Sequence, residues 1–140
     1  MASSSEVDRR LLLDVGLTTG ATPALADLRH SVRHALVNAD DNCVEDAELL
    51  VTELVSNAFD HGRPPMHLRL CLLPNAPTVH IEVEDGDRLH LPLLGTSRLG
   101  GERGRGLVLV EQLASDWGCT VEVESKIVWA QMNCRMLSVV

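Results

Sequence analysis

The stretch LLVTELVSNAFDHGRPP (Leu49–Pro65) decides the fold. Its apolar residues recur every three or four positions, and Gly62 with the prolines that follow ends the pattern, so the stretch predicts an amphipathic helix. Glu53 and Asn57 lie one turn apart at the border of the apolar stripe. By itself, such a pair is most simply explained as a solvated helix edge, and other parts of the sequence must decide whether it belongs to a site.

Two further features favour a site. Asp85 closes an alternating strand in IEVEDGD, and the glycine cluster of GGERGRGLVLVEQL (Gly100–Leu113) opens a helix. A glycine-rich turn before a helix offers free N–H groups and the positive end of the helix dipole, which suits phosphate, although a simple cap and flexible loop would look the same. G-x-x-x-x-G-K-[ST] is absent, because the only lysine is Lys126, and G-x-G-x-x-G after a first strand is also missing.

Outward from this helix, hydrophobic spacing predicts an order of strand, helix, helix, two strands, loop, helix and two strands. Helices grouped around antiparallel strands predict an α+β fold with two layers. The predicted elements are a strand over Leu11–Leu17, a helix over Pro23–Ala39 behind the N-cap Thr22, the central helix capped by Asp40 or Asp41, a hairpin of Met66–Leu72 and Val79–Val83, a lid loop over Asp85–Arg103, a helix from Leu107, and strands Cys119–Glu124 and Ile127–Met132.

Composition limits the possible functions. The chain has 140 residues and a formal charge of −8, which argues against direct binding to nucleic acid. No apolar run could span a bilayer and no signal peptide is visible, so we expect a cytoplasmic protein without membrane contact. We expect a flexible segment over residues 1–10 and one domain over 11–140. The four cysteines form no C-x-x-C pair, and we expect reduced thiols.

Together, ELVSNAFDHG, IEVEDGD and GRGLVLVEQLASDWG resemble the Bergerat-type (GHKL) ATP-binding fold of gyrase, Hsp90, histidine kinases and MutL. They look most like the actinobacterial anti-sigma-factor serine/threonine kinases similar to RsbW and SpoIIAB. The resemblance spans about residues 23–132. It implies a two-layer sandwich in which helices cover one face of a mixed, mainly antiparallel sheet.

The resemblance also implies the ligands, ATP and Mg²⁺, and a role for each matching residue. Asn57 would supply its amide oxygen to Mg²⁺, and Glu53 would act as the catalytic base or orient the attacking hydroxyl. Asp85 would accept a hydrogen bond from the adenine amino group. The remaining binding residues would let the backbone approach the phosphates; they are Gly101, Gly104, Gly106 and, in the same motif, Leu107.

The implied function is a partner switch, in which the protein binds a sigma factor and phosphorylates an anti-anti-sigma (STAS-type) antagonist. A homodimer is also implied. Asp85-Gly86-Asp87 is followed by Arg88, whereas family kinases usually carry a second glycine there. Two alternatives therefore stay open: a non-catalytic ATP-dependent binding module, and a degenerate interaction domain of the same fold.

Overall fold

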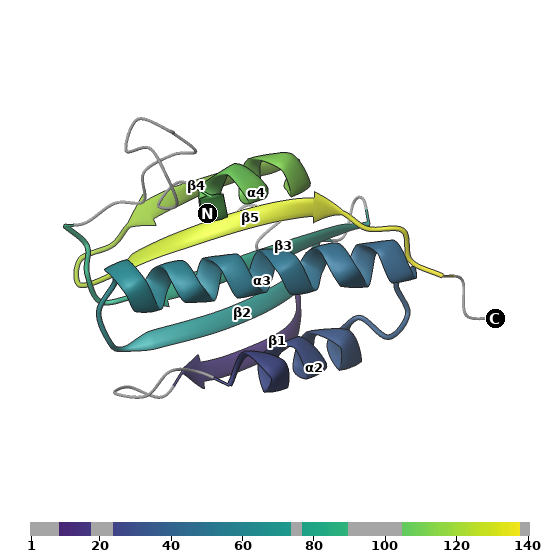
Figure 1. Ribbon diagram of the computed structural model, residues 1–140, viewed down its shortest axis with the longest axis horizontal. Coiled ribbons are helices and arrows are strands. Elements are labelled where there is room, and N and C mark those ends of the chain that lie inside the picture. The colour runs from purple at the N-terminus through teal and green to yellow at the C-terminus, as the bar shows by residue number, and fades with distance from the viewer. Residues whose placement is uncertain (1–8, 18–23, 74–76, 90–104, 138–140) are drawn as a thin grey trace.

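The computed structural model describes residues 9–17, 24–73, 77–89 and 105–137. Five strands form one sheet in the order β1-β2-β3-β5-β4, and every described pair is antiparallel. Three helices cover one face, which confirms the two-layer α+β sandwich (Figure 1). The elements are β1 (Arg10–Leu17), α2 (Leu25–Ala35), α3 (Asp41–His61), β2 (Met66–Leu73), β3 (Thr78–Asp85), α4 (Arg105–Leu113), β4 (Asp116–Val121) and β5 (Lys126–Asn133).

Helix α3 is the central helix that the opening stretch predicts. Asp40 caps it, because its side chain accepts a hydrogen bond from the backbone N–H of Cys43 at 2.8 Å. Gly62 ends it and donates its own N–H to the carbonyl of Ala58 at 2.7 Å. Both ends of the helix are thus determined locally, as the sequence predicted.

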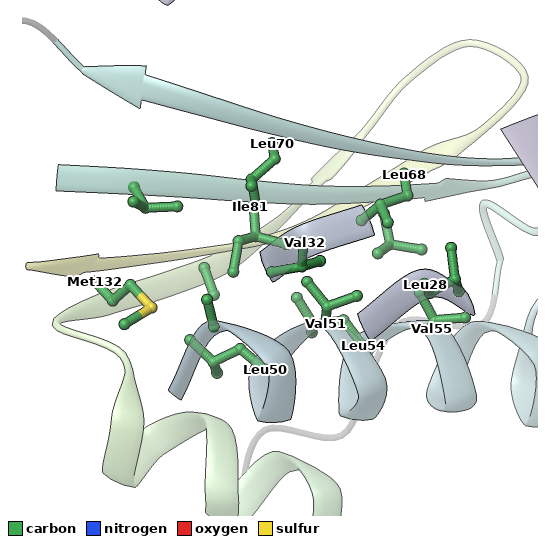
Figure 2. Close-up of a cluster of buried hydrophobic side chains, with 14 of the residues drawn as sticks. Leu28, Val32, Leu50, Val51, Leu54, Val55, Leu68, Leu70, Ile81 and Met132 are labelled. Carbon is green, nitrogen blue, oxygen red and sulfur yellow. The ribbon is translucent and has the colours of Figure 1, made fainter. Parts of the chain in front are cut away.

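The core lies between α3 and the sheet. Figure 2 shows the α3 side chains Leu50, Val51, Leu54 and Val55 pointing toward the strands. Opposite them, Leu68 and Leu70 of β2 pair in register with Val83 and Ile81 of β3, and all are buried. Burial of such a side chain stabilises the fold by about 1.5–3 kcal/mol. The buried core is aliphatic, and Phe59 and Trp117 pack against it as partly buried side chains.

The predicted boundaries of α2 and β4 were wrong. Helix α2 begins after Ala24 and ends at Ala35, inside the predicted Pro23–Ala39, because Leu36 turns fully into the core and Ala39 forms a bridge with Met136. Strand β4 spans Asp116–Val121, three residues earlier at both ends than the predicted Cys119–Glu124, because the hairpin turns after Val121, where the N–H of Glu122 donates to the carbonyl of Ser125. The predicted lid lies outside the described residues from position 90 onward.

The expectation of reduced thiols was wrong for two of the four cysteines. Cys43, in the first turn of α3, forms a disulfide with Cys134, which follows β5 directly. Their Cα atoms lie 5.3 Å apart, although 91 positions separate them in the sequence. Cys71 and Cys119 are free. No spacing rule could pair the two residues, because the sheet brings them together. Among the described residues, no helix is long and apolar enough to cross a membrane.

Candidate functional site

Helix α3 presents Glu53 and Asn57 on the flank that faces α4. On its other flank, Glu48 contacts Arg33 of α2 with 2.5 Å between Oε1 and Nη2. Asn57 follows Glu48 by two and a half helical turns, and therefore lies on the opposite side of the helix. Glu53 lies one turn before Asn57. Helices α2 and α4 pack on either side of α3 (Figure 1), so the pair borders the α3–α4 side.

Both side chains are half-buried. Neither has a hydrogen-bond partner within the part of the chain that the structure describes. Their polar atoms still reach water, because neither residue has a fully buried polar atom without a partner. A carboxylate and an amide that are not engaged within the described part of the fold are free to contact a ligand. The pair is therefore available to a ligand on the α4 side of α3.

Asp85 ends β3 and is only 1% exposed. Its Oδ1 accepts hydrogen bonds from the backbone N–H of Asp87 at 2.8 Å, from the N–H of Arg63 at 3.4 Å and from the ammonium of Lys126 at 3.2 Å. Lys126 stands opposite Asp85 in the β3–β5 register. The carboxylate therefore has a buried cationic partner, which the sequence patterns did not indicate.

Two glycines join the end of α3 to Asp85. A Cβ on Gly62 would lie 2.6 Å from Cγ of Asp85, and a Cβ on Gly86 would lie 2.5 Å from the carbonyl oxygen of Pro64. The N–H of Gly86 also donates to the carbonyl of Arg63 at 2.6 Å. The backbone at the end of α3 thus packs against the Asp85 side chain at the end of β3. This contact brings Asn57 and Asp85 to the same end of the sandwich.

The glycine-rich segment leads into α4. Gly106 and Leu107 lie in the first turn of α4, whose nine residues pack beside α3. The predicted start at Leu107 was wrong by two residues, because α4 begins at Arg105 and takes Gly106 into its first turn. The first turn of a helix offers N–H groups and the positive end of the helix dipole. Gly101 and Gly104 lie outside the described residues.

The donor set at Asn57 fits Mg²⁺ that is held together with phosphates. Mg²⁺ prefers oxygen ligands and usually keeps several waters, so one amide oxygen beside a carboxylate is a sufficient protein contribution. In the described ranges, no group of three His, Cys, Asp or Glu side chains could hold a metal ion alone. A cation here would depend on the nucleotide for most of its ligands.

A second polar cluster lies on the sheet face that the helices leave open. Glu82 accepts one hydrogen bond from the His80 imidazole at 2.9 Å and another from Nε of Arg69 at 3.1 Å. These two donors, first His80 and then Arg69, lower the pKa of Glu82 to about 2 against the opposing effect of burial. The His80 ring stacks on Trp129 with centroids 5.7 Å apart. This cluster lies away from Glu53 and Asn57, on the other side of the sheet.

Sequence reasoning missed two residues near Asp85. The sequence patterns mark Gly62 only as the end of a helix, and Lys126 only as a lysine that lies outside any G-x-x-x-x-G-K-[ST] motif. The signal that could have found Lys126 is its position at the start of a strand, directly after a turn, as the sole lysine of the chain.

Comparisons with known proteins identify the family and the fold. Residues 19–132 match the family model of the histidine kinase-like ATPase domain. No match was found among functionally curated proteins. A similar fold occurs in the crystal structure of the RsbU and RsbW domains of Rv1364c from Mycobacterium tuberculosis, with a TM-score of 0.62 and 20% identity. The likeness covers 91% of this chain and 34% of the other, so the chain spans about a third of that protein.

The family match covers most of the chain and includes Glu53, Asn57, Asp85 and the start of α4. This chain belongs to the histidine kinase-like ATPase domain family, whose fold binds ATP.

Proposed function

We propose that the protein is an ATP- and Mg²⁺-binding anti-sigma factor that phosphorylates a serine or threonine of an anti-anti-sigma (STAS-type) antagonist. The observation that carries the proposal is the half-buried, unpartnered pair Glu53 and Asn57 on the α4 side of α3. Neither side chain has a hydrogen-bond partner among the described residues. Membership in an ATPase family supports nucleotide binding, and the likeness to a structure with an RsbW domain supports the regulatory role.

Each residue has a separate task in this proposal. Asn57 offers its amide oxygen to Mg²⁺, which when bound neutralises phosphate charge. Glu53 accepts the proton of the attacking hydroxyl or orients that hydroxyl. Asp85 accepts a hydrogen bond from the adenine amino group. Backbone N–H groups of the glycine-rich segment and of the first turn of α4 hold the phosphates. The residues are Gly101 and Gly104 before the helix, and Gly106 and Leu107 within its first turn.

The proposed partners are proteins. A formal charge of −8 disfavours a nucleic-acid partner, and sigma factors act where transcription occurs, so we place the protein in the cytoplasm. We further propose that residues 11–140 act as a single ATP-binding domain and that the protein forms a homodimer.

A second candidate is a non-catalytic module that uses ATP only to order an interaction surface. The sequence Asp87-Arg88 favours it, because a second glycine is missing where family kinases usually have one. Here Asp87 is 7% exposed and its N–H is committed to Asp85, so the turn is held by side chains. A degenerate domain without nucleotide is disfavoured by the unpartnered pair on α3.

Calorimetric titration with ATP, with and without Mg²⁺, tests the proposal. We expect Mg²⁺-dependent binding that Asn57→Ala abolishes and that Asn42→Ala, an exposed amide at the other end of α3, leaves unchanged. Transfer of labelled phosphate from ATP to a purified STAS-type protein then separates the kinase from the non-catalytic module. Absence of ATP binding by the unmodified protein would leave only the degenerate domain.

A further inference from the structure

Lys126 and Asp85 form a buried ion pair at the end of the sheet where the proposed nucleotide site lies. Lys126 is 3% exposed and Asp85 is 1% exposed. Burying two charges is unfavourable unless their remaining donors and acceptors are satisfied. Pairing of β3 with β5 extends over eight residue pairs, so the strands do not need this charge pair to stay together.

The pair has unused hydrogen-bonding capacity on both sides. Three N–H donors reach Oδ1 of Asp85, whereas Oδ2 is approached only by the Lys126 ammonium, at 3.2 Å, among the described residues. The ammonium carries three hydrogens and makes two hydrogen bonds there, to Asp85 Oδ1 and to the carbonyl of Asp87 at 2.8 Å. An acceptor and a donor with free capacity therefore lie side by side.

This arrangement complements the edge of adenine, where the 6-amino group donates and the neighbouring N1 accepts. We propose that Asp85 and Lys126 recognise the base as a unit, with Oδ2 of Asp85 accepting from the 6-amino group and Nζ of Lys126 donating to N1. The inference rests on the proposed ATP-binding function and adds Lys126 as a specificity-determining residue.

The same pair rejects bases with the reverse pattern. Hypoxanthine and guanine carry a carbonyl at position 6 and an N–H at position 1, so the carboxylate would face an oxygen and the ammonium would face a hydrogen. A site that must leave buried polar groups unpaired discriminates strongly against such a ligand. Guanine could pair with Asp85 only if the base shifted in its plane, so that its N1–H and 2-amino group, in place of the 6-carbonyl, faced the carboxylate.

Nucleotide analogues test the contacts in the unmodified protein. Calorimetry would compare ATP with 1-deaza-ATP, which lacks N1, with purine riboside triphosphate, which lacks the amino group, and with ITP and GTP. We expect each of these four to bind about 10- to 100-fold more weakly than ATP, because each loses hydrogen bonds to a charged group. Equal affinity for 1-deaza-ATP would overturn the role of Lys126, and equal affinity for GTP would overturn adenine readout by the pair.

Variants then assign the N1 contact to Lys126. Lys126→Met should bind ATP and 1-deaza-ATP equally, whereas Arg63→Met, which removes an exposed cation from the adjacent loop, should keep the ratio of the unmodified protein. If Lys126→Met fails to fold because Asp85 is left without its cation, the double variant Asp85→Asn/Lys126→Met removes both charges and should show the same loss of discrimination. Retained discrimination in either folded variant contradicts the inference.

The outcomes separate this inference from the proposed function. Failure of ATP itself to bind removes the proposed function and the inference with it. Mg²⁺-dependent ATP binding with no preference over 1-deaza-ATP keeps the proposed function, and leaves Lys126 as a structural partner of Asp85.

Discussion

The Cβ position of Gly62 lies 2.6 Å from Cγ of Asp85. This contact joins the residue that ends α3 to the residue that ends β3, and it leaves no room for a side chain. The backbone φ of Gly62 is −100°, which any residue can adopt, so the requirement for glycine is one of space and not of conformation. The position of the Asp85 carboxylate therefore depends on a residue 23 positions earlier in the chain.

Substitution of Gly62 by alanine is expected to destabilise the protein by about 1–3 kcal/mol, because the methyl group would collide with Asp85 and with the carbonyl oxygen of Ala58. Urea denaturation measures the change. Gly16→Ala is the control, because a Cβ at Gly16 meets nothing within 4 Å. Equal urea midpoints for Gly62→Ala and Gly16→Ala would show that the Asp85 side chain can move aside without loss of stability.

Replacement of Glu53 by glutamine is expected to retain ATP binding and to lower phosphate transfer by about 10²–10⁴-fold, the usual contribution of a positioned general base. The amide keeps the size of the side chain and removes its proton affinity. Single-turnover transfer to the STAS-type antagonist is the measurement. Asp60→Asn, an exposed carboxylate on the same helix, should transfer at the unmodified rate. Unchanged transfer by Glu53→Gln would exclude Glu53 as the base.

The ionised Glu82 should add an increment to the free energy of unfolding, and this increment should depend on pH. Its folded pKa of about 2 lies below the ordinary value of 4.5, so the increment is complete above pH 4.5 and is lost as the pH falls toward 2. Glu82→Gln removes the increment, on the order of 2 kcal/mol. Denaturation of both proteins from pH 6 to pH 2 should show the difference shrinking with acid. A constant difference over this range would contradict the assignment, and Glu111→Gln on exposed α4 surface is the control.

Reduction of the Cys43–Cys134 disulfide is expected to destabilise the protein by about 4 kcal/mol, because the bond closes a long loop of the unfolded chain. Thermal unfolding with and without a thiol reductant measures the loss. Cys134→Ser should be equally destabilised and should no longer respond to reductant. Cys119→Ser removes a free thiol and should keep the full response of the unmodified protein. An unmodified protein insensitive to reductant would show that the bond contributes little.

Local sequence patterns were sufficient to predict the central helix and the hairpin of the sheet. The three- and four-residue spacing of α3 with its cap at Asp40 and its end at Gly62 predicted a helix whose bounds the structure confirms. The alternation in β2 and β3 predicted their hairpin, because period two places every second side chain in the core. Predicted boundaries failed at Leu36 and Cys119, where burial and strand register overrode the local pattern.

The sequence by itself determined the α+β class, the central helix and the residues Glu53, Asn57 and Asp85 as candidates, because these signals depend on neighbours within a few positions. Only the tertiary structure decided that Asp85 pairs with Lys126, 41 positions away, and that Cys43 bonds to Cys134. It also decided that Glu53 and Asn57 border α4. The physical reason is that sheet register and helix packing bring distant residues together, and this proximity leaves no periodic trace along the chain.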